Sequence, residues 1–447
     1  MKNSLSQNLI TLAESCPYPL YVVGGRVRDF IAGLKPEVYD NDICAPADAE
    51  DFLTRAKTCG FTGGAVYKNT GTVKLSLNGE GYEFTSFRSD EYVRGVHKPV
   101  NTFFTDDITL DAKRRDFKCN AVYYDIRADK IVDPLGGVKD IKNKIITTVD
   151  RAEKVFGEDG LRLMRLARIS AQTGFTPSDE CMEGAKRNCA LISDIAPERI
   201  CAELTAILHA DEKYGVNNAQ YKGLCILRDT GVLKIILPEL AAGEGMGQPE
   251  AYHSYDVLEH SLRCVAYADR TIRLAALLHD VGKPLCKLRD GNYHMHDKEG
   301  AAIALDICRR LHVSKKLAEK TAKLIALHMY DLAGNARENK VRAFIVRNYD
   351  LFDELLLLKQ ADFSACKDNL CVAPSVEKFT AIYEKMKSEG LPFRVKELNV
   401  RGDELIAAGL PKERTADILK ELLKACAIKQ VKNEKHALLS YALKVAN

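Results

Sequence analysis

The chain has 447 residues, of which 46% are hydrophobic and 28% are charged, and its formal net charge is +3. A chain of this length normally exceeds what one hydrophobic core serves, so we expect roughly two to four compact units. No apolar stretch reaches the roughly 20 residues that span a bilayer, and the N-terminus lacks a secretory signal pattern, so we expect a cytoplasmic protein. The small net charge does not by itself indicate a nucleic-acid-binding protein.

The cysteines are scattered singly along the chain. There are 14 of them, without a C-x-x-C pair or zinc-ribbon spacing. This pattern favours buried, reduced thiols over disulfides.

The hydrophobic pattern predicts an α+β fold. After a first helix near the N-terminus, short β-rich runs alternate with glycine-rich turns, which predicts a small sheet with helices packed on it. These runs are YVVGG, AVYKNTGTVKLSL, GYEFTSF, NAVYYDI and KIITTV. From Arg151 onward the pattern is helical almost throughout, with Pro197, Pro238 and residues 243–250 (GEGMGQPE) as joints. We therefore predict an α/β head and an all-helical body, and residues 243–250 are the best linker candidate.

A strand that ends in two glycines, followed by two aspartates, gives the strongest local signal. In LYVVGGRVRDFIAG, Gly24 and Gly25 would let a triphosphate approach the backbone, where a helix N-terminus and Arg28 supply donors. Asp40 and Asp42 alternate on an extended segment, so their carboxylates project to one side and can hold Mg²⁺. Two such ions activate an attacking 3′-hydroxyl and stabilise the departing pyrophosphate. Each piece also occurs as a tight turn or a polar loop, but their order and spacing favour a site.

This combination resembles the first motif of the DNA polymerase β-like nucleotidyltransferases. The resemblance is to the class that contains bacterial tRNA nucleotidyltransferases (CCA-adding enzymes) and poly(A) polymerases. It covers nearly the whole chain, from about Tyr21 to Leu443, because further motifs follow in the family's order. It implies nucleotide addition to the 3′ end of RNA, with the aspartate pair as catalytic metal ligands.

The segment YEFTSFR, which begins at Tyr82, matches the family's strand after the aspartate pair. Glu83 alternates with apolar neighbours on this strand and is a candidate for a third acidic group near the metals. The alternative is a carboxylate that is only solvated on an open strand face. The sequence leaves both interpretations open.

The segment RRDFKCNA resembles the family's R-R-D-F-x-x-N-A motif, which implies contacts to the ribose and phosphates of the incoming nucleotide. Arg115 supplies a bidentate phosphate donor, while Asp116 and Asn120 supply hydrogen-bond partners for a ribose hydroxyl. A surface ion pair is the alternative, but two adjacent arginines before a β run favour an anion site. The following DPLGG matches the family's D-P-x-G-G turn, and we predict a structural role for it.

The segment EDGLRLMRLAR resembles the family's E-D-x-x-R helix, which implies that Asp159 and Arg162 form a protein template for the incoming base. A carboxylate accepts from the exocyclic amine of C or A, and a guanidinium donates to a ring nitrogen or carbonyl oxygen. Arg165 and Arg168 share a helix face with Arg162 and would contact phosphates; a solvated, salt-bridged face is the alternative. Residues 198–203 (ERICAE) match the next motif and are expected to brace this helix.

Histidines and aspartates on successive predicted helices form a second candidate site. The segment LAALLHDVGKP carries an adjacent His-Asp pair and resembles the HD phosphohydrolase superfamily. The resemblance implies a divalent transition metal, and it leaves open whether that metal hydrolyses phosphate esters or cyclic phosphates. His294 and His312 fall outside the pattern and are predicted to be surface histidines or histidines with satisfied hydrogen bonds. The usual ligands map onto His260, His279, Asp280 and Asp362, with His296 and His328 as candidates for a second metal.

The sequence therefore predicts a CCA-adding enzyme that uses CTP, ATP, Mg²⁺ and the 3′ end of tRNA. Poly(A) polymerase is the nearest alternative, and an enzyme that adds only A or only CC is another. The C-terminal lysines are candidates for tRNA phosphate contacts, or for solvated helix faces. The predicted regions are a nucleotidyltransferase head (1–149), a neck with the template helix (150–242), an HD-type domain (243–365) and a helical tRNA-binding region (366–447).

Overall fold

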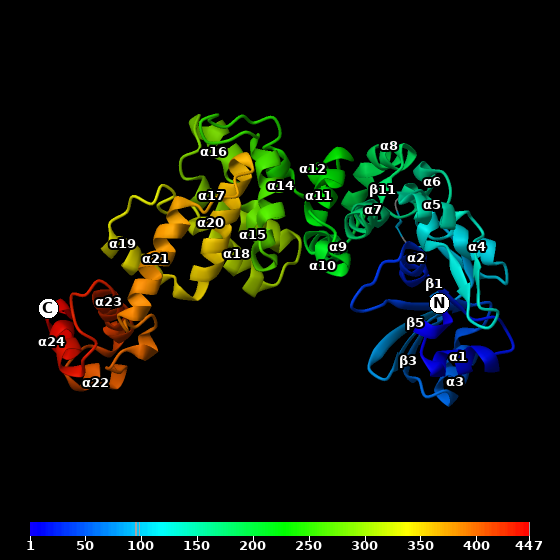
Figure 1. Cartoon of the computed structure of the whole chain (residues 1–447), viewed down its shortest axis with the longest axis horizontal. Coiled ribbons are helices and arrows are strands. Elements are labelled where there is room, and N and C mark those ends of the chain that lie inside the picture. Colours follow the sequence, from blue (N-terminus) through cyan, green and yellow to red (C-terminus); the bar gives the residue numbers. More distant parts are fainter. Residues whose placement is uncertain (94–95, 98, 447) are drawn as a thin grey trace. The chain divides into compact units, whose positions relative to one another are not determined.

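The computed structural model describes residues 1–93, 96–97 and 99–446, and it divides the chain into two compact units, residues 1–241 and 242–447 (Figure 1). The first unit contains a mixed sheet and helices, and the second is helical, so the predicted α+β fold is confirmed. Within the described ranges, no helix is long and apolar enough to cross a bilayer. All 14 cysteines are free; Cys371 is exposed, and the others are buried or partly buried.

A seven-stranded sheet forms the base of the first unit, in the order β3-β4-β5-β2-β1-β8-β9. β2 and β5 run parallel and all other neighbours are antiparallel. A separate ribbon pairs β6 (Arg88–Glu91) with β7 (Asn101–Phe104). The strands of the main sheet are β1 (Tyr21–Val23), β2 (Asn41–Ala45), β3 (Thr62–Tyr67), β4 (Thr72–Leu77), β5 (Glu80–Ser86), β8 (Tyr123–Asp125) and β9 (Lys130–Val132).

Two predicted β runs differ in the structure. The run AVYKNTGTVKLSL is not one strand, because a 3-10 turn and Gly71, with φ of 59°, divide it into the β3-β4 hairpin. The run KIITTV lies outside the main sheet, where β10 (Ile145–Ile146) pairs with β11 (Thr176–Pro177). The backbone after β10 bonds to the segment before β8 instead, through Lys118 N to Thr147 O.

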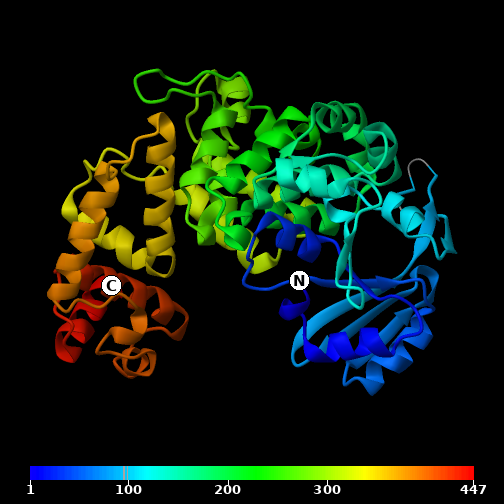
Figure 2. The ribbon, with the colours of Figure 1, turned by 45° about the vertical axis from the view of Figure 1, so that its right-hand side comes forward.

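The described part of the head contains five α-helices, of which α2 and α3 pack on the strands of the main sheet. The predicted first helix is confirmed, and its N-cap Ser6 accepts a hydrogen bond from the amide of Leu9. The apolar face of α3 covers β3, β4 and β5 (Figure 2). The rings of Phe52 and Phe84 are stacked there, 3.7 Å apart. These helices are α1 (Gln7–Ser15), α2 (Gly25–Ala32), α3 (Ala49–Thr58), α4 (Ile108–Lys113) and α5 (Gly137–Asn143).

The DPLGG segment has the predicted structural role. The carboxylate of Asp133 accepts hydrogen bonds from the amides of Gly137 and Val138 at the start of α5. A Cβ at Gly137 would lie 2.1 Å from the carbonyl oxygen of Lys118, so only glycine fits there. This turn therefore holds α5 against the segment that carries the RRDFKCNA motif.

The rest of the first unit is helical, as predicted, apart from β11. The helix that carries the E-D-x-x-R arginines, α7, packs against α9 and α11. Pro197 occupies the first turn of α9, where its missing N–H is not needed. The helices are α6 (Ala152–Glu158), α7 (Leu161–Thr173), α8 (Asp179–Asn188), α9 (Pro197–Leu208), α10 (Asp211–Tyr214), α11 (Ala219–Asp229), α12 (Val232–Ile236) and α13 (Pro238–Ala241).

The second unit begins with the predicted linker, but residues 243–250 are not free. Tyr293 donates a hydrogen bond to the carbonyl of Gly247 at 2.7 Å, and Lys283 donates to the side chain of Gln248 at 2.6 Å. The segment is therefore a folded part of this unit. The four-region division of the chain remains a prediction.

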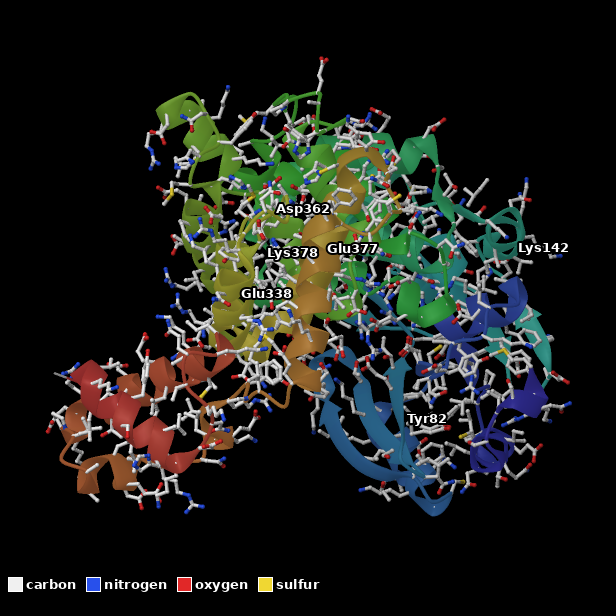
Figure 3. The ribbon with its side chains drawn as sticks, turned by 60° about the vertical axis from the view of Figure 1, so that its left-hand side comes forward. Tyr82, Lys142, Glu338, Asp362, Glu377 and Lys378 are labelled. Atoms are coloured by element: carbon white, nitrogen blue, oxygen red, sulfur yellow. The ribbon has the colours of Figure 1, made fainter. Side chains whose placement is uncertain are left out.

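Helices make up the remainder of the second unit. α14 packs along α20 and α15, which brings HD-motif residues from three parts of the sequence together. α21 is tied to the segment around α19 by Lys378, which donates to Gly334 O at 2.6 Å, and by the Lys385–Glu338 ion pair. Figure 3 labels Lys378 and Glu338. The helices are α14 (Val257–Tyr267), α15 (Arg273–Leu278), α16 (Lys283–Asp290), α17 (His296–Arg310), α18 (Lys315–Leu327), α19 (Glu338–Arg347), α20 (Phe352–Lys367), α21 (Pro374–Ser388), α22 (Gly402–Ala407), α23 (Thr415–Ala427) and α24 (Lys435–Ala446).

Candidate active site and metal centre

A cavity of about 370 Å³ in the first unit collects most of the predicted head and neck residues. This volume is in the range of small-molecule sites. Both aspartates line it, and so do all three arginines of α7, which therefore share a helix face as predicted. The predicted residues that line it are Gly24, Gly25, Arg28, Asp40, Asp42, Arg115, Asp116, Asn120, Asp159, Arg162, Arg165 and Arg168. Residues that the sequence did not single out are Arg114, Gln172, Arg199 and Lys213.

Asp42 lies on β2 directly beside the turn between β1 and α2. Gly24 has φ of 77°, and a Cβ there would lie 3.1 Å from Asp42 Oδ2, so the turn needs glycine for both reasons. Burial raises the pKa of Asp42, and the charges of Asp40 and Glu83 raise it further against the opposing effect of Arg115. Crowded carboxylates in a buried setting gain stability from a cation, so Asp40 and Asp42 fit a divalent metal.

Glu83 is the in-register neighbour of Asp42 on the parallel strand β5. Its side chain is 48% exposed and lies 3.8 Å from Lys74 Nζ. Glu83 does not line the cavity. Its role as a third metal ligand therefore stays a prediction.

Lys213 is a site residue that no sequence motif indicated. It lies on α10 and its Nζ donates to Asp40 Oδ2 at 2.8 Å, across 173 positions of sequence. The preceding and following residues carry no pattern that would have revealed it. The contact places a positive charge beside the aspartate pair.

Arg28 was predicted to contact phosphate, but in the structure its guanidinium is bonded to other protein side chains. It is buried, and its guanidinium donates to Asp29, to Asn120 Oδ1 at 2.8 Å and to the hydroxyl of Tyr214 at 3.0 Å. Tyr214 also donates to Asp29 at 2.7 Å. Four of the five N–H groups of Arg28 are therefore used within the protein, where they orient Asn120 and link α2 to α10.

The two arginines of RRDFKCNA are held by Asp111, which the sequence also gave no reason to single out. Asp111 is fully buried and accepts from Arg114 Nε at 2.7 Å and from Arg115 Nη2 at 3.0 Å. Although burial opposes its charged form, these arginines lower the pKa of Asp111 to about 2. Within the described part of the chain, the Nη1 group of Arg115 donates to no protein atom and remains available at the cavity.

Asp116 and Asn120, the predicted ribose partners, are bonded to each other. Asn120 Nδ2 donates to Asp116 Oδ1 at 3.3 Å, and Arg165 Nε donates to Asp116 Oδ2 at 2.7 Å. Burial disfavours the charged carboxylate, but Arg165 and the amide of Phe117 lower the pKa of Asp116 to about 2. The RRDFKCNA motif and α7 are thus joined at the wall of the cavity.

The E-D-x-x-R helix is braced by α9, as predicted. Arg199 donates to Asp159 Oδ2 at 3.3 Å, and Arg168 donates to Glu203 at 2.6 Å. Both Arg199 and Glu203 come from the ERICAE motif. The Asp159 carboxylate also accepts from the amide of Leu161, and it retains acceptor capacity toward the cavity.

Arg162 is not paired with Asp159. Its Nη1 donates to Glu158 at 2.6 Å and to the carbonyl of Val155 at 2.9 Å, and its Nη2 donates to Arg114 O at 2.8 Å. Three of its five N–H groups are thus used to fix the guanidinium, and among the described residues the other two have no hydrogen-bond acceptor. A rigidly held arginine with free donors at the cavity wall is suited to hydrogen bonding a base edge.

In the second unit, the predicted HD residues converge in one buried cluster. His260 Nε2 lies 3.0 Å from Asp362 Oδ1 and 3.1 Å from His279 Nε2. Asp280 Oδ2 lies 3.3 Å from His279 Nε2 and 3.5 Å from His260 Nε2. Lys283 Nζ is 2.6 Å from the same carboxylate oxygen. His260, His279 and Asp362 form one group that can hold a metal ion, and Asp280 Oδ2 lies beside two of its members.

The other oxygen of Asp280 faces a second group. Asp280 Oδ1 lies 3.3 Å from His296 Nε2 and 3.9 Å from His328 Nε2. Both Nε2 atoms are buried and make no hydrogen bond. Asp280 therefore lies between two groups of side chains, each of which could hold one metal ion, as in a two-metal centre. His294 and His312 are exposed, which confirms their surface assignment.

Backbone carbonyls fix the orientation of three of these imidazoles. The Nδ1–H groups of His279, His296 and His328 donate to the carbonyls three residues earlier, at 2.7 to 2.8 Å. This leaves each Nε2 lone pair directed to the cluster, which is the usual arrangement of metal-binding histidine. Burial also lowers the pKa of His328 to about 3, which keeps it neutral. The donor set fits divalent metal ions.

Comparison with known proteins shows which protein family the chain resembles. Family models match three consecutive segments: a poly A polymerase head domain (20–147), a probable RNA and SrmB-binding site of polymerase A (174–243) and an HD domain (251–355). The chain belongs to the tRNA nucleotidyltransferase and poly(A) polymerase family. The aspartate pair therefore lies in the first matched segment, and the HD cluster lies in the third except for Asp362, which follows it.

Curated members of this family are similar over most of the chain. The A-adding tRNA nucleotidyltransferase of Deinococcus radiodurans is 28% identical, with 93% of each chain covered. The multifunctional CCA protein of Vibrio vulnificus is 29% identical over 77% of this chain and 84% of its own. The CCA-adding enzyme of Geobacillus stearothermophilus is 33% identical, over 59% of this chain and 60% of its own.

Solved structures share the fold. The Bacillus stearothermophilus CCA-adding enzyme, solved in complex with CTP, has a TM-score of 0.67 at 24% identity, with 98% of this chain and 97% of its own covered. The Thermotoga maritima CCA-adding enzyme complexed with tRNA has a TM-score of 0.60 at 17% identity, with 98% and 94% covered.

Proposed function

We propose that this protein adds the 3′-terminal CCA to tRNA from CTP and ATP. The observation that carries the proposal is the single cavity in which the Asp40–Asp42 pair faces Asp159 and Arg162. A carboxylate pair for metal ions and a carboxylate–guanidinium pair for a base edge are the two elements that template-free nucleotide addition requires. Relatives solved with CTP, with ATP and with tRNA support these substrates.

Each side chain of the cavity has a distinct task in this reaction. Asp40 and Asp42 would hold Mg²⁺, which when bound supplies activation of the 3′-hydroxyl and charge neutralisation for the pyrophosphate. The amides at the start of α2 and the free Nη1 of Arg115 bind phosphate oxygens. Asp159 accepts from the exocyclic amine of C or A, and Arg162 donates to the adjacent ring acceptor. Glu83 lies outside the cavity and would add negative charge from the strand beside Asp42.

The substrate range is tested with three tRNA ends. Purified protein is incubated with tRNA that lacks CCA, with tRNA ending in C and with tRNA ending in CC, in the presence of CTP and ATP. A CCA-adding enzyme completes all three ends and then stops. Extension of the CC end alone would identify an A-adding enzyme, like the Deinococcus radiodurans relative, and long A tails would identify a poly(A) polymerase. Either result would overturn the proposal.

Lys213 is expected to support transfer of every nucleotide equally. Its ammonium lies beside Asp40 at the phosphate side of the cavity and does not contact the template residues. We expect Lys213→Met to lower kcat/KM for CTP and ATP by about tenfold each, since one charge contact is worth about 1.4 kcal/mol here. Steady-state kinetics with tRNA ending in C and in CC measure this.

The matched control is Lys222→Met, because Lys222 is exposed on α11 and does not line the cavity. It should leave both values unchanged. A loss for CTP but not ATP in the Lys213 variant would contradict a phosphate-side role.

For the second unit we propose phosphohydrolase activity on phosphate esters or 2′,3′-cyclic phosphates, with transition metals in the HD cluster. Asp280 lies between the two ligand groups, one of which contains His260, His279 and Asp362 and the other His296 and His328. Ions bound there would supply activation of water and charge neutralisation for a phosphate group. The tRNA-binding role of residues 366–447 and a cytoplasmic location remain predictions from the sequence.

Removal of His279 and Asp280 should separate the two activities. We expect His279→Ala with Asp280→Ala to lower hydrolysis of 2′,3′-cyclic AMP by at least about a hundredfold, because both metal groups lose a ligand. Nucleotide addition should stay within about twofold of wild type, since no residue of the cluster lines the nucleotide cavity.

His294→Ala removes an exposed histidine of the same unit and serves as the control. If the His279→Ala, Asp280→Ala variant lost nucleotide addition at an unchanged melting temperature, the nucleotide cavity and the HD cluster would be coupled. The two activities would then not be independent, contrary to the proposal.

A further inference from the structure

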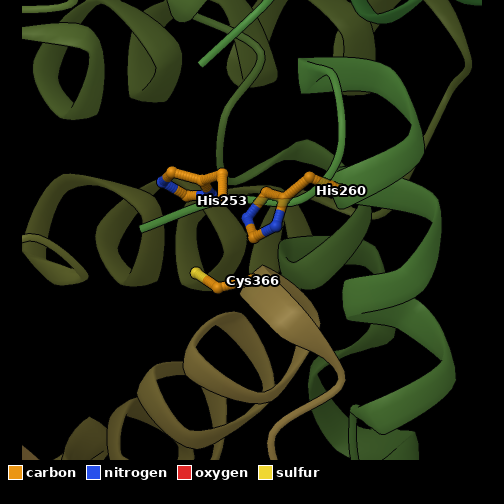
Figure 4. A group of neighbouring side chains, drawn as sticks. All are labelled: His253, His260 and Cys366. Atoms are coloured by element: carbon orange, nitrogen blue, oxygen red, sulfur yellow. The ribbon is translucent and has the colours of Figure 1, made fainter. Parts of the chain in front are cut away.

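A third group of potential metal ligands adjoins the HD cluster. His253, His260 and Cys366 each offer one ligand atom, and these atoms all lie within 4.8 Å of one another. Figure 4 shows the three side chains converging from the segment before α14, from α14 itself and from α20. His253 and Cys366 have no place in the phosphohydrolase proposal.

The backbone holds this group together. The amide of Ser254 donates to the carbonyl of Cys366 at 2.9 Å, which fastens the segment carrying His253 to the end of α20. Cys366 follows Asp362 by one helical turn, so both side chains lie on the same face of α20. The rings of His253 and His260 meet edge to face, with centroids 5.0 Å apart. The geometry therefore does not depend on one flexible side chain.

Two nitrogens of this group lack partners. His260 is fully buried, and its Nδ1 makes no hydrogen bond, whereas Nδ1 of His279, His296 and His328 donates to a carbonyl. The Nδ1 of His253 is likewise buried without a partner. Buried polar atoms are rarely left unpaired, so these two nitrogens are suited to bind an ion or a water molecule.

The chemistry of the donors selects the ion. Two imidazoles and a thiolate are borderline and soft ligands, which favour Zn²⁺ or Co²⁺ over the oxygen-seeking Mg²⁺. His253 and Cys366 are only partly buried, so an ion can enter from solvent. Three protein ligands would leave one tetrahedral position for water or a substrate oxygen. Binding releases the Cys366 thiol proton to solvent, because a thiolate is the ligating form. When both nitrogens of His260 ligate ions, its N–H proton is released to solvent as well.

We propose that His253, His260 and Cys366 form a thiolate-containing transition-metal site that adjoins the HD cluster and shares His260 with it. The proposal goes beyond the phosphohydrolase assignment, which needs neither His253 nor Cys366.

Cobalt spectroscopy of the full-length protein tests the site. Metal-free, reduced protein is titrated with Co²⁺ alone, and a thiolate-to-Co²⁺ charge-transfer band is expected in the near ultraviolet, which Zn²⁺ displaces. Cys366→Ser should lose this band. Cys371→Ser, which alters an exposed cysteine five positions further on, should keep it. His253→Ala should raise the Kd for Co²⁺, measured by titration of this band, by at least about tenfold.

Two further measurements separate a thiolate site from misfolding and from metal binding at the HD ligands. Nucleotide addition and the melting temperature should be unchanged in Cys366→Ser, which excludes misfolding. The band should persist in the His279→Ala, Asp280→Ala variant, because neither residue belongs to the group. No band in the wild type, an undiminished band in Cys366→Ser, or loss of the band in the His279–Asp280 variant would overturn a separate thiolate site.

Discussion

Replacement of Asp42 by asparagine is expected to abolish nucleotide transfer while the protein stays folded. The change keeps the shape of the side chain and removes the charge that the metal requires. Loss of a metal ligand costs several kcal/mol of transition-state stabilisation, so we expect kcat/KM to fall on the order of a thousandfold or more. The measurement is single-turnover addition of CMP and AMP to tRNA in the presence of Mg²⁺. Asp40→Ala should behave in the same way.

The thermal stability of Asp42→Asn should not fall together with its transfer activity. Because burial raises the pKa of Asp42 above its unfolded value, its ionised form destabilises the folded state at neutral pH. Asp42→Asn should therefore melt at the same or a slightly higher temperature at pH 7. Asp106→Asn, which changes an exposed aspartate outside the cavity, is the control and should leave transfer unchanged. Transfer within tenfold of wild type in Asp42→Asn would rule out the two-metal assignment.

Replacement of Asp159 by alanine is expected to change which base is added. The carboxylate is the acceptor for the exocyclic amine of C and A, and a wrong base leaves polar groups unpaired at about 1 to 3 kcal/mol each. We expect discrimination against UTP and GTP to fall by about ten- to a hundredfold, together with slower use of CTP and ATP. Single-turnover addition with each of the four nucleoside triphosphates measures this.

Arg165→Ala is the informative comparison. Its guanidinium pairs with Asp116 on the same wall and should affect all four nucleotides about equally, with unchanged selectivity. Arg162→Ala is a weaker test, because it also removes hydrogen bonds to the carbonyls of Val155 and Arg114. If Asp159→Ala kept wild-type selectivity, Asp159 would not read the base, and the helix face would be only a salt-bridged surface.

The sequence by itself determined which candidate site residues share one face of a single helix or extended segment. Asp40 and Asp42 face the same cavity because alternate residues of an extended segment point to one side. Arg162, Arg165 and Arg168 share a face because three-residue spacing nearly matches the helical turn. The HD ligands could be named from the sequence only through the family resemblance.

Only the tertiary structure decided which partners these residues meet. Lys213 reaches Asp40, and Tyr214 and Asn120 take up the donors of Arg28, across distances in sequence that no local pattern spans. Asp111 is buried under two arginines, and His253 joins Cys366 across α14 and α20. The reason is physical: backbone periodicity sets the face on which a side chain lies, whereas the packing of distant elements sets which charges and donors stand opposite that face.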